Sequence, residues 1–265
     1  MSKRLNLPTR SLGAETGIPD VAELSSWIAV HKGKALDLTR FRILQSLVPQ
    51  RKYGIGTPCA GGRFLRDRIG ASLTGLTGDR VTEDPEVNTG ILAADARAVA
   101  EEMPGAWCAL PAPDGLGIID DYFQDPDEWS DAICGVYRTI LRSMRDSGIA
   151  GNVLICEKAG NEEIASLTGK KVLFFQPDLD RTSLAILLEY QKEVVVRRDQ
   201  LAMVFDLADE YSFRNLCIVD PDPESIGLAL AHLDTDQLNV GGYCTADCED
   251  YWKNLAGSAT YERPR

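Results

Sequence analysis

The chain has 265 residues, a length that fits one α/β barrel or one doubly wound sheet with extensions. It carries 28 lysine and arginine residues against 40 aspartate and glutamate residues, which gives a formal net charge of −12. Because such a surface repels phosphate backbones, we do not expect nucleic acid as a partner.

The sequence also bears on location and on the state of the cysteines. No apolar run reaches the roughly 18–20 residues that span a bilayer. The basic start of the chain is not followed by the apolar core of a secretory signal. We therefore expect a cytoplasmic protein with no membrane contact. The seven cysteines form an odd count, which predicts reduced thiols instead of a disulfide framework.

The first half of the chain predicts helices and a few short strands. Residues 1–50 are expected to form a helical extension, because apolar residues recur there at helical spacing. The other elements expected before residue 150 are a strand, turn and helix at 53–69, a loop at 70–79, a helix at 85–103, extended segments at 106–110 and 116–119, and a helix at 127–144.

From residue 150 onward, short apolar segments alternate with helix-like stretches. Continuous apolar runs are typical of strands buried on both faces, and their alternation with helices predicts a parallel sheet. We therefore predict one α/β domain over 51–256, with regular βα repeats over 150–256 and a loose tail at 257–265. A TIM-barrel-like fold is favoured, and an open doubly wound sheet is the alternative. The expected strands are 152–156, 171–175, 193–197, 215–219 and 237–240, and the expected helices are 161–167, 182–191, 199–211, 223–233 and 246–255.

The carboxyl ends of parallel strands are where ligands bind in such folds. Aspartates at these ends also have a simpler interpretation as helix caps without a role in binding. Those that precede expected helices are Asp178, Asp180, Asp199 and Asp222. The residues expected to take part in catalysis are Asp178, Asp220 and Tyr243, and those expected to bind substrate are Arg63, Arg197, Gly241 and Gly242. The two glycines would let a ligand approach the backbone closely.

Two further motifs leave alternatives open. Cys244 and Cys248 are four residues apart, a spacing that suits a soft metal, a redox pair or two inert buried thiols. A zinc site would need another ligand, such as Cys156 or Cys59. The glycine-rich residues 54–62 before Arg63 are typical of an anion-binding loop and equally of a tight turn.

Several of these segments carry a family resemblance. Asp84 to Glu86, followed by Trp107 to Pro111 and Gly115 to Gly117, resembles the early barrel of the uroporphyrinogen decarboxylase and cobamide-dependent methyltransferase superfamily. Residues 60–65 are similar to the arginine-bearing N-terminal loop of the decarboxylase.

The second half of the chain adds to the resemblance. Leu154 to Cys156 and Gly242 to Cys244 lie near the positions where thiol-activating methyltransferases of that superfamily keep zinc ligands. The chain departs from the pattern at Leu154, where a histidine ligand would be expected.

This resemblance implies a TIM barrel that acts on a small molecule, as a methyltransferase or a decarboxylase in one-carbon, corrinoid or tetrapyrrole-related metabolism. It implies that Cys156 and Cys244, with Cys248 nearby, bind zinc and that Arg63 holds a substrate carboxylate or phosphate. A corrinoid-bearing protein would be a partner. Two alternatives remain: a non-catalytic ligand-binding or assembly subunit, which could form a homo-oligomer, and a cysteine-based redox protein.

Overall fold

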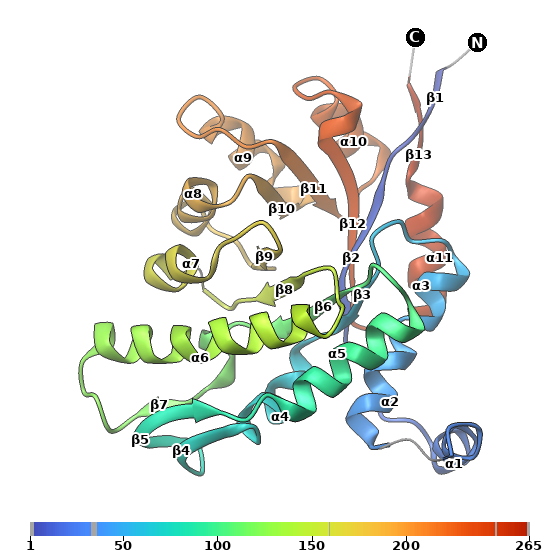
Figure 1. The fold of residues 1–265 in the computed structure, drawn as a ribbon. Coiled ribbons are helices and arrows are strands. Elements are labelled where there is room, and N and C mark those ends of the chain that lie inside the picture. The colour runs from blue at the N-terminus through green and yellow to red at the C-terminus, as the bar shows by residue number, and fades with distance from the viewer. Residues whose placement is uncertain (1–2, 33–35, 159, 247, 264–265) are drawn as a thin grey trace.

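The computed structural model describes residues 3–32, 36–158, 160–246 and 248–263, and two four-stranded parallel sheets form the centre of this part of the chain (Figure 1). Their strand orders are β10-β11-β12-β2 and β3-β6-β8-β9. The strands are β2 (Thr9–Ala14), β3 (Cys59–Gly61), β6 (Trp107–Pro111), β8 (Asn152–Ile155), β9 (Val172–Phe175), β10 (Glu193–Arg197), β11 (Asn215–Val219) and β12 (Leu238–Cys244).

The two sheets meet at two seams. At the first, the N–H of Ser11 on β2 donates to the carbonyl of Thr57 at 2.8 Å, and the N–H of Thr57 donates to that of Thr9 at 2.9 Å, just before β3. At the second, β9 and β10 are in contact, but no ladder of backbone hydrogen bonds joins them within the described ranges. The strands thus follow the order of a TIM barrel, with one seam that is not closed by the backbone. The prediction of a mostly parallel, barrel-like α/β fold is confirmed.

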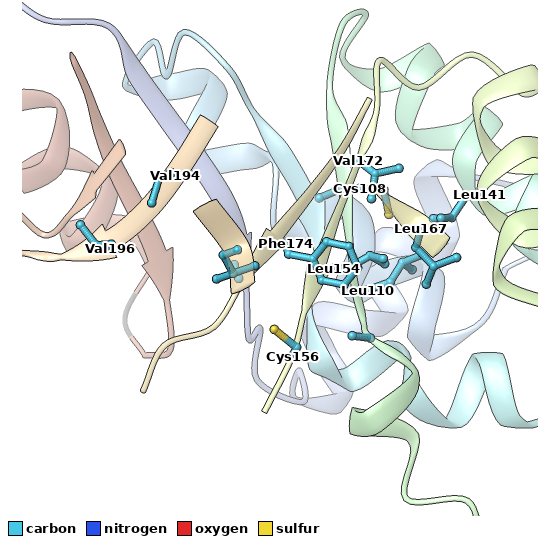
Figure 2. Close-up of a cluster of buried hydrophobic side chains, with 14 of the residues drawn as sticks. Cys108, Leu110, Leu141, Leu154, Cys156, Leu167, Val172, Phe174, Val194 and Val196 are labelled. Atoms are coloured by element: carbon cyan, nitrogen blue, oxygen red, sulfur yellow. The ribbon is translucent and has the colours of Figure 1, made fainter. Parts of the chain in front are cut away.

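The central strands bury both of their faces. On β8 and β9, Leu154 and Phe174 point outward to the helices, in a cluster that Figure 2 shows together with Cys156 and Val194. The alternate residues point inward and form a separate apolar cluster to which every central strand contributes. The inward residues are Leu12, Cys59, Ala109, Val153, Ile155, Leu173, Phe175, Val195, Cys217, Val219 and Tyr243. Burial on both faces explains why strands such as β8, β9 and β11 are continuous apolar runs in the sequence.

Helices follow most of the strands and cover the outside (Figure 1). The longest, α6, begins at Pro126, where Asp125 caps it by accepting from the N–H groups of Asp127 and Glu128. The helices are α1 (Val21–Val30), α2 (Leu38–Gln45), α3 (Val48–Lys52), α4 (Arg66–Gly70), α5 (Gly90–Glu102), α6 (Pro126–Asp146), α7 (Asn161–Leu167), α8 (Arg181–Tyr190), α9 (Leu201–Leu207), α10 (Pro223–Ala229) and α11 (Cys248–Ser258), with 3₁₀ turns η1 (Arg63–Leu65), η2 (Pro113–Leu116), η3 (Arg198–Gln200) and η4 (Thr235–Gln237). None of the helices in the described ranges is both long and apolar enough to cross a membrane.

The cap predictions are confirmed in part. Asp180 and Asp222 cap α8 and α10 by accepting from the N–H groups of Ser183 and Ser225. The prediction for Asp199 is wrong, because Asp199 lies inside the 3₁₀ turn η3 and α9 starts only at Leu201.

Two neighbouring segments differ from the predicted elements. The expected loop at 70–79 and the expected helix start at Pro85 are instead a hairpin of β4 (Leu73–Thr77) and β5 (Arg80–Val87), which turns at Gly78 with a φ of 67°. The short β7 (Ile119–Asp120) joins this sheet, and α5 starts only at Gly90.

The ends of the chain also carry strands that the helical pattern did not predict. β1 (Lys3–Asn6) pairs antiparallel with β13 (Thr260–Arg263), so residues 260–263 are not a loose end. β2, a central strand, comes from the segment expected to be a helical extension. The predicted boundary between an N-terminal extension and the α/β domain at residue 50 stays a prediction. The segment before this boundary contributes β2 to a central sheet.

A glutamine side chain occupies the β9–β10 seam, and we predict that it stabilises the barrel. Gln191 is 4% exposed; its Oε1 accepts from the N–H of Phe174 at 2.5 Å, and its Nε2 donates to the Phe174 carbonyl at 3.4 Å. Gln191→Ala would leave both backbone groups of Phe174 unpaired, and we expect the free energy of unfolding to fall by about 2 kcal/mol.

Urea unfolding, together with hydrogen exchange of the Phe174 amide, measures this effect. The control is Gln237→Ala, whose side chain bonds Asp234 and Arg214 at the surface and should cost less than about 1 kcal/mol. Equal losses in the two variants, with an unchanged Phe174 exchange rate, would show that the seam does not depend on Gln191.

Candidate active site at the carboxyl ends of the strands

A carboxylate and a tyrosine meet where β12 and β2 end. Tyr243 on β12 is 8% exposed; its ring packs against that of Phe175 on β9, with 5.7 Å between ring centroids. Its hydroxyl donates to Oε1 of Glu15, which also accepts the backbone N–H of Arg63 at 2.6 Å. Burial and the neighbouring Glu15 carboxylate raise the pKa of Tyr243, so the hydroxyl keeps its proton and remains a donor.

Gly62 makes this close approach possible. A Cβ at position 62 would lie 2.7 Å from the carbonyl oxygen of Ala14 and 2.9 Å from Oε1 of Glu15. Any other residue would push the Glu15 carboxylate away. The glycine-rich segment is therefore a close backbone packing point that brings Arg63 next to Glu15.

A second carboxylate and tyrosine meet at the end of β11. The hydroxyl of Tyr251, on α11, donates to Oδ1 of Asp220 at 2.6 Å, and the N–H of Asp220 donates to the carbonyl of Gly241 at 3.0 Å. Asp220 has a φ of +50°, a left-handed conformation that costs energy in a residue with a side chain. Partial removal from water raises the pKa of Asp220, while Tyr251 and the nearby Arg197 and Arg198 act to lower it.

The two carboxylate–tyrosine pairs are joined through β12. The side chain of Tyr243 belongs to the first pair, and its backbone N–H interacts with the Tyr251 hydroxyl of the second. The structure therefore brings Glu15 and Asp220, which are 205 residues apart in the sequence, to the same side of the sheet.

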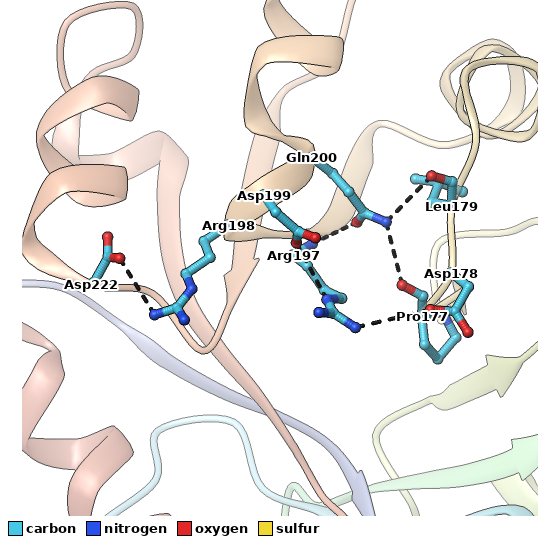
Figure 3. Close-up of polar contacts among 8 residues, drawn as sticks. All are labelled: Pro177, Asp178, Leu179, Arg197, Arg198, Asp199, Gln200 and Asp222. Carbon is cyan, nitrogen blue, oxygen red and sulfur yellow. Dashed lines mark hydrogen bonds and ion pairs between the residues drawn. The ribbon is translucent and has the colours of Figure 1, made fainter.

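A cavity of about 290 Å³ opens beside Asp220, between the ends of β10 and β11. It is lined by Arg197, Arg198, Asp199, Val219 and Asp220. Figure 3 shows the two arginines pointing in different directions: Arg197 toward Asp199 at 3.3 Å and Asp178 at 3.9 Å, and Arg198 toward Asp222 at 3.3 Å. These side chains are about half exposed, and ion pairs of this kind are weak, so an anion can compete for either guanidinium.

A larger cavity of about 1090 Å³ lies at the opposite, amino-terminal ends of β9, β10 and β11, where Lys192, Glu193 and Asp236 are among its walls. Its basic and acidic side chains balance. We place the candidate site at the carboxyl ends instead, because the paired carboxylates, the tyrosines and the strained Asp220 all lie there.

Of the residues that the sequence predicted for the site, Tyr243, Asp220 and Arg197 lie at this rim, and Arg63 adjoins it through its backbone. The side chain of Asp178 is 95% exposed and contacts only Arg197 among the ion pairs of the described residues. Side chains of the protein occupy the space beside the two glycines of β12 that was expected to hold a ligand. A Cβ at Gly241 would lie 2.4 Å from Sγ of Cys217, and one at Gly242 would lie 2.6 Å from the Tyr251 hydroxyl.

The cysteines predicted to bind metal are not brought together. Cys156 directly follows β8 and belongs to the outer core, where burial raises the pKa of its thiol, whereas β12 lies in the other sheet. Cys244 and Cys248 form a disulfide, so the prediction of reduced thiols is wrong for this pair. Within the described ranges, no group of three or more His, Cys, Asp or Glu side chains is arranged to hold a metal. These residues do not fit a zinc site.

The sequence did not single out Glu15 or Tyr251. Glu15 follows β2, whose residues include serine, threonine and glycine and lack a continuous apolar run. Tyr251 lies within a predicted helix, and its contacts with Gly242 and Asp220 join segments that the sequence pattern does not relate. The position of Tyr251, three residues after Cys248 of the cysteine motif, was the one feature of the sequence that pointed to it as a site residue.

Comparisons with known proteins show which solved structures share this fold. No family model matches the sequence, and no curated protein matches it. Among solved structures, a B12-independent methionine synthase from Shewanella sp. W3-18-1, in complex with selenomethionine, aligns with a TM-score of 0.55 over 96% of both chains at 13% identity. A structure assigned as a vitamin-B12 independent methionine synthase from Listeria monocytogenes aligns with a TM-score of 0.53 over 96% of this chain and 94% of that chain at 12% identity. At these identities the likeness concerns the fold alone, and this chain has the barrel-like α/β fold of both structures.

Proposed function

We propose that this protein is an enzyme that transfers a methyl group to or from a small amino-acid-like molecule bound at the carboxyl ends of its strands. The observation that carries the proposal is the pair of linked carboxylate–tyrosine contacts, Glu15 with Tyr243 and Asp220 with Tyr251, beside two exposed arginines. The shared fold with two structures described as methionine synthases favours methyl transfer over decarboxylation.

The charges at the rim are complementary to a zwitterion. A free amino acid presents an ammonium group and a carboxylate a few ångströms apart. Asp220 can accept hydrogen bonds from the ammonium group, and Arg197 or Arg198 can donate to the carboxylate in a charge-assisted contact. The cavity of about 290 Å³ beside these groups has the size of a small ligand site.

The same groups can handle the proton that methyl transfer releases. When an acceptor thiol attacks a methyl carbon, a sulfur–carbon bond forms, the bond from that carbon to the donor breaks, and the thiol proton must leave. A carboxylate at hydrogen-bond distance takes the proton as a general base, and a tyrosine hydroxyl holds that carboxylate in position. Glu15 is the base we propose, since Asp220 is assigned to the ammonium group. Zinc is not part of the proposed function, because the cysteines of the described residues do not fit a metal site.

L-Methionine is expected to bind the wild-type protein, and Asp220→Asn is expected to weaken that binding by about ten- to a hundredfold, because one charged hydrogen bond to the ammonium group is lost. Isothermal titration calorimetry measures the affinity. 4-(Methylthio)butanoate, which is methionine without its ammonium group, should bind equally weakly to both proteins.

Asp236→Asn is the matched control, since Asp236 lines the cavity at the other end of the strands. Loss of methionine binding in this variant, with normal binding in Asp220→Asn, would move the ligand to that cavity and contradict the proposal. Methyl transfer is then tested by mass spectrometry of methionine formed from homocysteine with a panel of methyl donors. Binding without turnover would favour a non-catalytic ligand-binding subunit.

A further inference from the structure

The disulfide between Cys244 and Cys248 lies directly next to the candidate site. Cys244 is the last residue of β12 and is fully buried, whereas Cys248 is the first residue of α11 and is partly exposed. Their Cα atoms are 5.7 Å apart, within the usual range for a disulfide. The other cysteines, at positions 59, 108, 134, 156 and 217, are free and buried.

The two tyrosines of the site flank this disulfide. Tyr243 immediately precedes Cys244, and Tyr251 follows Cys248 by three residues, within the first turn of α11. The Tyr251 ring packs over Gly242, and its hydroxyl bonds Asp220 at 2.6 Å. The disulfide thus ties the strand that carries Tyr243 to the helix turn that carries Tyr251.

We propose that Cys244 and Cys248 form a reversible thiol–disulfide exchange site, at which the oxidised form holds Tyr251 against Asp220 and reduction releases the first turn of α11. The co-reactants are small dithiols or the dithiol of a partner reductase. Closing the short loop between β12 and α11 restricts this turn in the oxidised chain, and the constraint is lost when the bond opens.

The exposure of the two sulfurs sets the order of events. An incoming thiolate reaches Sγ of Cys248, forms a mixed disulfide there, and expels Sγ of Cys244, which takes up a proton. The second thiol of the reductant then attacks the reductant sulfur that is bonded to Cys248. This closes the disulfide of the reductant and releases Cys248 as a thiol. The sum is one dithiol oxidised to its disulfide and one protein disulfide reduced to two thiols.

Differential alkylation tests the exchange step in the folded protein. After treatment with dithiothreitol and iodoacetamide, peptide mass spectrometry should show Cys248 labelled and the five buried cysteines protected. Without the reductant, Cys248 should be unlabelled, and reoxidation should restore this protection. Equal labelling of Cys248 in the oxidised and reduced samples, or reduction only in denaturant, would overturn the proposal.

Hydrogen exchange tests the release of the helix turn. Amides 249–252 should exchange about tenfold faster in the reduced protein, while those of α6 stay unchanged. The double variant Cys244→Ser, Cys248→Ser should show the fast rates in the presence and absence of reductant. Unchanged rates on reduction would show that the disulfide does not hold Tyr251.

The link to ligand binding rests on the proposed function. Reduction should weaken L-methionine binding by about three- to tenfold, because Tyr251 no longer positions Asp220. If neither form binds methionine but the exchange rates respond to reduction, the redox site stands and the proposed substrate is wrong. If methionine binds both forms equally while the rates respond, the exchange site stands and its coupling to the ligand is wrong.

Discussion

Asp95→Ala is expected to lower the free energy of unfolding by about 3–5 kcal/mol, the largest effect of any single substitution considered for this protein. Asp95 on α5 is 3% exposed and pairs with Arg40 of α2 at 2.8 Å and with Arg68 of α4 at 3.1 Å. Burial raises the pKa of Asp95, and the two guanidinium groups act in the opposite direction. Removing the carboxylate takes away an acidic group that both nearly buried guanidinium groups contact, although Arg68 keeps its ion pair with Asp37 at 2.6 Å.

Chemical denaturation of the purified variants measures this loss. Glu102→Ala is the control, because Glu102 lies on the same helix but pairs with Arg51 at the surface, where an ion pair contributes less than about 1 kcal/mol. If Asp95→Ala and Glu102→Ala cost the same, the network does not join α2, α4 and α5 in the way the contacts indicate.

Glu163→Gln is expected to make the protein more stable above pH 7 and to flatten the dependence of its stability on pH. Burial, and then the charge of Asp114, raise the pKa of Glu163 from 4.5 to about 7. The folded protein therefore binds this proton more tightly than the unfolded chain. Stability conferred by the protonated form is fully present below pH 4.5 and is lost as the pH rises to 7, by as much as about 3 kcal/mol.

Unfolding curves between pH 5 and 8 measure the slope in the wild type and in each variant. Glu162→Gln removes the same charge from the neighbouring, exposed position of α7 and should leave the slope unchanged. A Glu163→Gln protein that keeps the wild-type slope would show that another group titrates. Asp114 is the first to examine, since its carboxylate accepts the N–H groups of Glu157 and Lys158 and the pKa of Asp114 is also raised by burial.

The βα repeats of the second half were predictable because their signal is local. Strands such as β9 and β11 bury both faces, so their residues form unbroken apolar runs, and helix caps such as Asp222 are set by neighbouring residues. β2 gave no such signal, because Arg10, Ser11 and Gly13 interrupt its apolar residues. A Cβ at Gly13 would lie 2.6 Å from Cβ of Ala109.

The residues of the candidate site likewise fall into those that the sequence could indicate and those that it could not. Asp220, Tyr243 and Arg197 could be selected from the sequence because they end strands, and strand ends gather at one rim of a parallel sheet. Glu15 and Tyr251 could not, since each becomes a partner of these residues only through contacts between distant segments. The cysteine spacing left a metal site, a redox pair or inert thiols open, and only the tertiary structure shows that Cys244 and Cys248 form a disulfide while Cys156 follows a strand of the other sheet.

The sequence by itself therefore determined the fold class, the parallel direction of the strands and the strand ends at which polar groups collect. These features follow from periodicity and helix caps, which depend on residues close together in the sequence. The tertiary structure alone decided that β2 completes the barrel order, that the Gln191 side chain pairs with the backbone of Phe174 at the seam, and that two carboxylates meet two tyrosines. Each of these depends on how the chain closes on itself, and no local pattern records which distant side chains closure brings into contact.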